Sequence, residues 1–213
     1  MRIESVEFVC SAGSVVECPA GSLPEVAVSG RSNVGKSSLL NHLVGKRRLA
    51  QVSKTPGKTQ RLHFFLVNGK FHLVDLPGYG YARVPESVQR DWRVMMQGYL
   101  RQRRQLVGVL QLVDSRHPPS RQDCEMVEWL LAEKLAFCLV TTKTDKLQAG
   151  ERRQALAGIA RDLRVPAALP FVPFSSQSRE GVKELGAWLA QTLESAASRP
   201  ALRGGNGSGP KGG

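Results

Sequence analysis

The sequence predicts an α/β fold, in which a mostly parallel β-sheet carries helices on both faces. Apolar runs typical of buried strands alternate with amphipathic stretches along the chain, as in successive βα units. A glycine-rich segment at residues 30–37 joins a strand-like run to a helix-like run. The pair Asn68-Gly69 joins two strand-like runs and is a strong signal for a β-hairpin.

Each element follows from a local pattern. Apolar runs predict buried strands, the hairpin makes its first strand antiparallel, and two prolines place the last strand at a sheet edge. Ser120, followed by Asp123, has the spacing of a helix N-cap. Six strands are expected, one of them an antiparallel edge strand, at residues 24–29, 61–67, 71–75, 106–113, 135–141 and 168–174. Helices are expected at residues 38–44, 86–104, 120–134, 148–163 and 182–195.

The chain divides into one domain and two flanks. Residues 24–197 are expected to form the domain, residues 1–23 an extension that packs on it or leads into it, and residues 198–213 a disordered glycine-rich tail. No apolar run approaches the ~20 residues that span a bilayer, and the N-terminus lacks a secretion signal. The cysteines show no metal-ligand spacing, so reduced thiols in a cytoplasmic protein are expected.

Residues 30–37, GRSNVGKS, match the phosphate-binding pattern G-x-x-x-x-G-K-[ST]. The glycines let the backbone turn so that N–H groups face phosphate oxygens, and the helix N-terminus adds partial positive charge. Lys36 is expected to reach the β- and γ-phosphates, and Ser37 to ligate Mg²⁺. This loop serves ATP and GTP alike, so later segments must decide the base.

Residues 75–78, DLPG, supply a second contact to the phosphates. Asp75 ends a predicted strand, where its carboxylate can hold Mg²⁺ through water. The Gly78 N–H can then meet the γ-phosphate, which a side chain would obstruct.

Residues 142–145, TKTD, predict guanine as the base. The Asp145 carboxylate can accept hydrogen bonds from N1–H and the 2-amino group of guanine, whereas adenine offers neither donor. The Lys143 stem can pack on the purine face, and Ser175-Ser176 can offer backbone N–H groups to guanine O6.

In this order, GRSNVGKSSLLN, TPGKTQ, DLPGYGYA and TKTDK resemble the EngB (YihA/YsxC) family of bacterial ribosome-biogenesis GTPases, over about residues 5–195. The resemblance implies a Ras-like P-loop GTPase domain that binds GTP or GDP with Mg²⁺. It also implies a role in assembling the large ribosomal subunit from rRNA and ribosomal proteins, and a need for the protein in normal cell division and septation.

The resemblance implies functional roles for the residues of this sequence that stand at the matching motif positions. Lys36, Thr59 and Gly78 are implied to act in catalysis, with Thr55 as a second candidate for the role of Thr59. Ser37 and Thr59, with Asp75 through water, are implied to hold Mg²⁺. The implied nucleotide-binding residues are Gly30, Arg31, Ser32, Asn33, Val34, Gly35, Lys36, Ser37, Ser38, Gly57, Lys58, Thr59, Asp75, Leu76, Pro77, Gly78, Thr142, Lys143, Thr144, Asp145, Phe174, Ser175 and Ser176.

Two replacements bear on activity. Thr142 stands for the commoner asparagine and gives up an amide that ties loops together, so modest nucleotide affinity is expected. Tyr79 stands where many Ras-like GTPases carry a water-orienting glutamine, so slow intrinsic hydrolysis is expected. Two sources of assistance for GTP hydrolysis remain open. One is a K⁺ ion held in part by Asn33, by analogy with potassium-activated GTPases, and the other is a group from the ribosomal partner.

The charge suits a polyanionic partner. With 30 Lys+Arg and 18 Asp+Glu, the formal net charge is +12. Tyr79, Tyr81 and Trp92 are candidates for stacking on bases, although a core position is favoured for Trp92. Basic residues near the expected switch segments, 45–60 and 78–90, are Lys46, Arg47, Arg48, Lys54, Lys58, Arg61, Arg83, Arg90, Arg93, Arg101, Arg103 and Arg104.

Three functions remain open at this point. The leading one is a GTPase switch in ribosome assembly, whose switch segments the γ-phosphate orders through Thr59 and Gly78. The alternative is a nucleotide-gated rRNA-binding factor in which hydrolysis is incidental. A P-loop ATPase is the third, and both Asp145 and the Asn-Gly hairpin argue against it. A monomer is expected, with no DNA or membrane partner.

Overall fold

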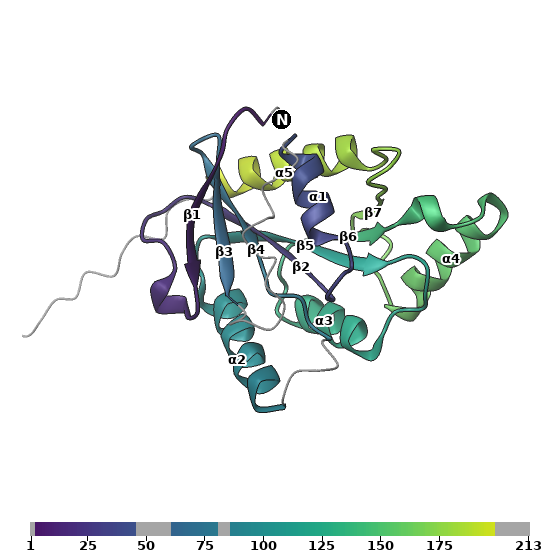
Figure 1. Cartoon of the computed structure of the whole chain (residues 1–213), viewed down its shortest axis with the longest axis horizontal. Helices are drawn as coiled ribbons and strands as arrows, with labels where there is room; N and C mark the ends of the chain where they lie inside the picture. Colours follow the sequence, from purple (N-terminus) through teal and green to yellow (C-terminus); the bar gives the residue numbers. More distant parts are fainter. Residues whose placement is uncertain (1–2, 46–60, 81–85, 199–213) are drawn as a thin grey trace, which may run out of the picture.

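The computed structural model describes residues 3–45, 61–80 and 86–198 of the 213-residue chain. These residues form one seven-stranded sheet, in the order β1-β3-β4-β2-β5-β6-β7, with helices packed against it (Figure 1). The strands are β1 (Val6–Ala12), β2 (Glu25–Gly30), β3 (Leu62–Val67), β4 (Phe71–Asp75), β5 (Leu106–Asp114), β6 (Phe137–Thr142) and β7 (Phe171–Pro173). The helices are α1 (Lys36–Leu43), α2 (Glu86–Gln102), α3 (Arg121–Ala132), α4 (Ala149–Asp162) and α5 (Val182–Ala197), with 3₁₀ turns η1 (Val15–Glu17) and η3 (Thr144–Lys146).

The sheet is mostly parallel, as the sequence predicts. Strand β2 pairs in parallel with β4 and β5, and β5, β6 and β7 continue in parallel. Strand β3 is antiparallel to both of its neighbours, β1 and β4. The expected α/β class and the single antiparallel strand are therefore confirmed.

The expected count of six strands is wrong, because the N-terminal segment adds β1 outside β3. Strand β3 is therefore not an edge strand. The pairing of β1 shifts register between Phe8 and Cys10, which interrupts the alternation of inward and outward side chains. Phe8 and Val9 also remain 45% and 42% exposed, so β1 lacks the apolar pattern of a buried strand.

Local signals place the hairpin and one helix cap correctly. Asn68 and Gly69 have φ angles of 51° and 64°, as a type I′ turn between β3 and β4 requires. Ser120 caps α3 in a capping box: its side chain accepts from the Asp123 N–H, and the Asp123 side chain accepts from the Ser120 N–H. Strand β7 is shorter than expected and lies at the predicted sheet edge.

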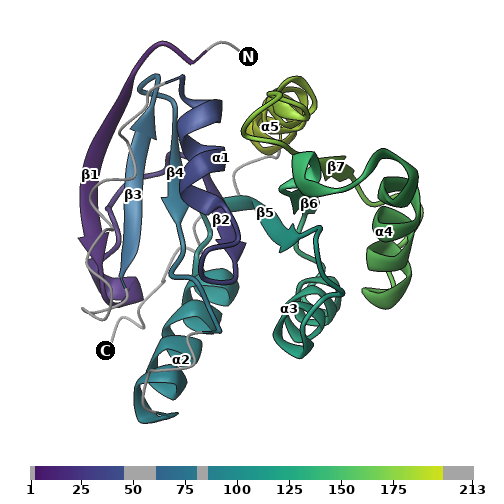
Figure 2. The same cartoon turned by 45° about the vertical axis from the view of Figure 1, so that its right-hand side comes forward.

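The helices form two layers around the sheet. Helices α1 and α5 cover one face, and α2, α3 and α4 cover the other (Figure 2). The first layer packs Leu39, Leu40, Leu185 and Leu189 onto the sheet. The second layer packs side chains such as Tyr99 and Leu130 onto the opposite face. Among the described residues, one apolar core therefore lies on each face of the sheet.

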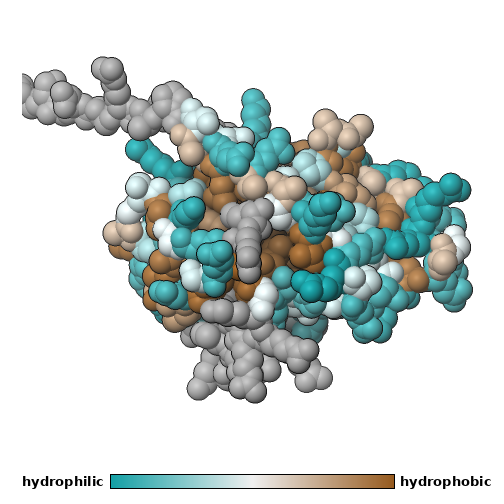
Figure 3. Space-filling model, turned by 90° about the horizontal axis from the view of Figure 1, so that it is seen from above, coloured by the Kyte–Doolittle hydropathy of each residue, from teal (hydrophilic) through white to brown (hydrophobic). Residues whose placement is uncertain are grey.

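Hydrophilic and hydrophobic residues are unevenly distributed over the surface. On the face seen in Figure 3, hydrophilic residues cover much of the right-hand side, and hydrophobic residues gather toward the middle and left.

None of the helices among the described residues combines the length and apolar character that crossing a bilayer requires. The four cysteines are free thiols, and Cys138 is fully buried as a small apolar residue. The expected tail, apart from Ser198, lies outside the described residues.

Candidate nucleotide site

The predicted phosphate and base segments meet at the carboxyl-terminal edge of the sheet. The phosphate loop runs from the end of β2 into α1, residues 75–78 follow from β4, and residues 142–145 leave β6. Because β2, β4 and β6 point the same way, their ends lie together at one edge, where open α/β sheets bind ligands. The fold thus gathers segments that are far apart in the sequence.

The phosphate loop has the backbone of an anion site. Gly35 caps α1 with a φ of 118°, a conformation that glycine adopts without strain, and Asn33 has a φ of 61°. Helix α1 begins at Lys36, two residues earlier than predicted, so the first-turn amides of Lys36, Ser37 and Ser38 have no intrahelical acceptor. These N–H groups and the helix dipole favour a phosphate.

Two opposite charges, half-buried Lys36 and buried Asp75, lie beside this loop and influence each other electrostatically. Burial lowers the pKa of Lys36 and raises that of Asp75 to about 6, and each charge partly opposes the shift of the other. Asp75 Oδ1 is buried with no hydrogen-bond partner in the described structure. A carboxylate oxygen left in this way fits the requirement of a water-bound Mg²⁺, which takes hard oxygen ligands.

Gly78 lies against the phosphate loop. A Cβ atom at this position would stand 2.9 Å from both Cα and N of Ser32 and 3.0 Å from Lys36 Nζ. The Ser32 N–H donates to the Tyr79 carbonyl at 2.8 Å, and Arg31 forms a parallel bridge with Tyr79. Leu76 is buried, its N–H bonded to Val28 O at 3.0 Å, and with Pro77 it leads from β4 to this contact.

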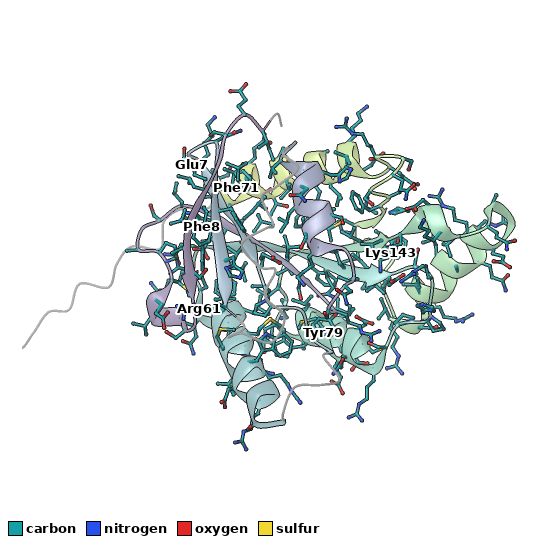
Figure 4. All side chains as sticks on the ribbon, viewed as in Figure 1. Glu7, Phe8, Arg61, Phe71, Tyr79 and Lys143 are labelled. Atoms are coloured by element: carbon teal, nitrogen blue, oxygen red, sulfur yellow. The ribbon has the colours of Figure 1, made fainter. Side chains whose placement is uncertain are left out.

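The base loop is tied to the phosphate loop by side chains. Thr142 Oγ1 donates to Val34 O at 2.6 Å, and Lys143 Nζ donates to Asn33 O at 2.8 Å. Thr142 lacks the amide of the commoner asparagine, but its hydroxyl still joins the two loops. The modest nucleotide affinity expected from this replacement stays a prediction. Lys143, labelled in Figure 4, is the residue that directly follows β6.

Lys143 also joins the base loop to the end of β5. Its Nζ donates to Asp114 Oδ2 at 2.8 Å. Burial opposes the ionisation of Asp114, but hydrogen bonds from Arg116 and Lys143 outweigh it and hold its pKa well below the ordinary value. Lys143 therefore links the phosphate loop to the end of β5. The packing of its stem on the purine stays a prediction from its sequence position.

Asp145 is oriented by Ser175. The Ser175 hydroxyl donates to Asp145 Oδ1 at 2.8 Å and accepts from the N–H groups of Gln177 and Ser178. The Asp145 side chain is 17% exposed. One carboxylate oxygen is thus committed to the protein, while the other, Oδ2, lies 3.8 Å from Lys146 Nζ.

One residue of this region has no signal in the sequence. Glu180 accepts from the Thr144 hydroxyl at 2.8 Å, pairs with Arg152, and accepts the Ser175 N–H through its carbonyl at 3.3 Å. The Ser175 amide is therefore engaged within the protein, which leaves the Ser176 amide to meet a base. The ring of Phe174, the residue before Ser175, packs edge-on against the ring of His42, with 5.9 Å between the two ring centroids.

Other predicted residues lie elsewhere. Gly57, Lys58, Thr59 and the alternative Thr55 fall outside the described residues, as do Tyr81 and the basic residues 46–58 and 83. Among the described basic residues, Arg103 is wrongly placed in an RNA-facing cluster, because it is only 11% exposed and bonded to buried Glu25. Arg61 and Arg101 form ion pairs with Glu17 and Glu133.

The expectation that Tyr79 stacks on bases is wrong. Tyr79 is 4% exposed, and its ring lies 6.2 Å from that of Trp92. Trp92 packs against the core on the α2 side, as the sequence favours. A cavity of about 420 Å³ lies between α2 and α3 beside these rings, and Gly78 is its one lining residue from the predicted nucleotide site.

The fold and these loops place the protein in the class of P-loop GTPases. Residues 25–143 match the family described as 50S ribosome-binding GTPase. A probable GTP-binding protein EngB from Pelotomaculum thermopropionicum is 48% identical over 193 residues, which cover 89% of this chain and 98% of the relative. Its counterpart from Heliobacterium modesticaldum is 46% identical over 185 residues, which cover 87% of this chain and 90% of that relative. The chain belongs to the EngB family of GTP-binding proteins.

Solved structures agree on the fold. A crystal structure of a probable GTP-binding protein engB has a TM-score of 0.68 at 21% identity, covering 80% of this chain and 99% of that one. A variant of Era from Aquifex aeolicus bound to GDP.AlF4⁻ has a TM-score of 0.59 at 21% identity, covering 82% of this chain and 57% of Era.

Proposed function

We propose that this protein hydrolyses GTP to GDP and acts as a switch in the assembly of the large ribosomal subunit in the cytoplasm. The observation that carries the proposal is the pairing of two sites at one sheet edge. A helix N-terminus with Lys36 suits phosphates, and Asp145, held by Ser175, suits guanine. Membership of a family described as 50S ribosome-binding GTPase supports the ribosomal partner.

The residues present suit Mg²⁺. Ser37, at the start of α1, and the unpartnered Asp75 Oδ1 would hold it, Asp75 through water, with Thr59 as a third ligand. When bound, Mg²⁺ neutralises negative charge on the β- and γ-phosphates. Lys36 neutralises the same oxygens, the α1 amides orient them, and Gly78 presents its N–H to the γ-phosphate.

Intrinsic turnover is slow in this proposal, because no water-orienting glutamine follows the D-x-x-G segment. Tyr79 cannot act as a base: burial raises its pKa well above the ordinary value, and Asp123 raises it further. Two activators are proposed as alternatives, K⁺ held in part by Asn33 and a group from the ribosomal partner. Turnover by the isolated protein in K⁺ and in Na⁺ separates them, because equal rates exclude the cation.

Cosedimentation with ribosomal subunits tests the switch. We expect the protein to pellet with the large subunit in the presence of a non-hydrolysable GTP analogue and to be released with GDP. Lys36→Ala is expected to abolish this difference because it removes a phosphate contact. Equal pelleting in both nucleotide states, or none in either, would contradict the proposal.

The second candidate is a nucleotide-gated rRNA-binding factor, in which the family's role in cell division and septation would follow from ribosome supply. It is favoured by exposed Arg90, Arg93 and Arg104 on and after α2. The double charge reversal Arg90→Glu with Arg93→Glu on α2 tests this candidate. The control is Arg153→Glu with Arg161→Glu, a charge reversal of equal size at exposed positions of α4. If assembly fails only with the α2 reversals and survives Lys36→Ala, binding rather than hydrolysis is the function.

A further inference from the structure

The side chain of Tyr79 ends in a buried hydrogen-bond network. Its hydroxyl donates to Asp123 Oδ1 at 2.8 Å and accepts from Gln111 Nε2 at 2.8 Å. Asp123 is 3% exposed, and Gln111 is fully buried in β5. A phenol with both a donor and an acceptor partner, and with little exposure, is held in one orientation.

The partners of this hydroxyl are themselves held. The other oxygen of Asp123, Oδ2, accepts from the Ser120 N–H at 2.9 Å and from the Ser120 hydroxyl at 2.6 Å, within the capping box of α3. Gln111 lies on a central strand that pairs with β2 and β6. The Tyr79 hydroxyl therefore connects to the capped start of α3 and to the middle of the sheet. Figure 4 labels Tyr79 beside α3.

The backbone of Tyr79 contacts the phosphate loop. Its carbonyl accepts the Ser32 N–H at 2.8 Å, and the preceding Gly78 approaches Ser32 so closely that a Cβ atom would stand 2.9 Å from Ser32 N. Gly78 is the residue to which the proposed function gives the γ-phosphate contact. Gly78 and the residue that follows it thus both lie against Ser32.

We propose that Tyr79 is a positioning residue that holds Gly78 in register with the phosphate loop by tying it to Asp123 and Gln111. This inference rests on the proposed function and deepens it. At the position where a glutamine would act on water, this chain has a side chain directed into the protein. Discrimination between GTP and GDP then depends on a hydroxyl that touches no nucleotide.

The variant Tyr79→Phe removes the hydroxyl and keeps the ring. We expect its affinity for guanylyl imidodiphosphate with Mg²⁺, measured by calorimetry, to fall roughly tenfold, about the effect of losing a buried hydrogen-bond group. Its affinity for GDP, which has no γ-phosphate, is expected to stay unchanged. A purely structural role would lower both affinities together.

Tyr99→Phe is the matched control. Tyr99 is fully buried, and its hydroxyl also donates to a carboxylate, Glu25 Oε2 at 2.9 Å, but Glu25 starts β2 at the sheet edge opposite the phosphate loop. This variant should lose stability and keep the GTP-to-GDP affinity ratio. An unchanged ratio in Tyr79→Phe, or an equal fall in Tyr99→Phe, overturns the inference.

A double variant tests whether the network acts as a unit. Asp123→Asn should lower the same ratio, and Tyr79→Phe with Asp123→Asn should lower it no further than Tyr79→Phe alone. Additive losses contradict the network. If Tyr79→Phe fails to fold, Asp123→Asn, which keeps the side-chain volume, provides the same readout. Failure of the wild type to bind either nucleotide would instead defeat the proposed function.

Discussion

At the scale of single residues, the candidate site holds two desolvated groups of opposite charge that compensate each other only in part. Asp75 is buried, its Oδ1 has no hydrogen-bond partner in the described structure, and its pKa is raised to about 6 by desolvation. Lys36 beside it has a lowered pKa for the same reason. Desolvated charged groups of this kind reduce the stability of the folded protein, and they are typical of functional sites.

The stability of Asp75→Asn tests this arrangement. An acid whose folded-state pKa is raised favours the folded state below its unfolded pKa of 3.8, and this contribution is lost as pH rises through about 6. Without ligand, Asp75→Asn should therefore be more stable than the wild type above pH 6, by at most about 3 kcal/mol, with a difference that shrinks toward pH 4. Denaturant unfolding at pH 5 and pH 7.5 measures it.

Magnesium and nucleotide provide the control. They should stabilise the wild type more than Asp75→Asn, because the amide is a poorer partner for a hydrated cation. A variant that is less stable than the wild type at pH 7.5 without ligand would show that the Asp75 charge is compensated in the folded protein.

At the scale of elements, the end of α2 is held to the start of β2. Arg103 donates to both carboxylate oxygens of fully buried Glu25, at 2.6 to 3.0 Å, and also to Pro19 O at 2.6 Å. Tyr99 donates to the same carboxylate. Helix α2 begins within one of the proposed switch segments, residues 78–90, and these contacts hold its opposite end to the sheet.

Removing the cation should therefore be costly. Arg103→Met leaves the Glu25 charge buried without its ion-pair partner, and a loss of about 3–5 kcal/mol in unfolding free energy is expected. Arg121→Ala breaks an ion pair whose arginine is 91% exposed and should cost less than about 1 kcal/mol. Thermal or denaturant unfolding compares them, and similar losses would refute the assignment of Arg103 to the interior.

At this scale, the sequence predicts those structural features that depend only on neighbouring residues. The turn at Asn68-Gly69 and the cap at Ser120 depend on neighbouring residues, and the structure confirms both. Strand β1 is not predicted, because its bulge breaks the alternating pattern. The loop motifs of the site are also local, whereas the contacts Tyr79–Asp123 and Arg103–Glu25 join residues 44 and 78 positions apart and have no sequence pattern.

At the scale of the whole molecule, the net charge of +12 favours a polyanionic partner. Binding to rRNA through phosphate contacts releases counterions, so the logarithm of the affinity should fall linearly with the logarithm of salt concentration. Between 50 and 200 mM KCl we expect at least a roughly tenfold loss, measured by filter binding to large-subunit rRNA. A salt-independent affinity would indicate that apolar contacts dominate instead.

The central claim is that Asp145 and Lys36 bind opposite ends of one guanosine triphosphate. Its most direct test is the affinity of the wild type and of Asp145→Asn for GTP, ATP and XTP, whose base carries an oxygen where guanine has its 2-amino group. We predict that the wild type prefers GTP by roughly a hundredfold or more, as for a buried charge left unpaired, and that Asp145→Asn prefers XTP. Equal affinity of the wild type for ATP and GTP, or an unchanged preference in Asp145→Asn, would contradict the account.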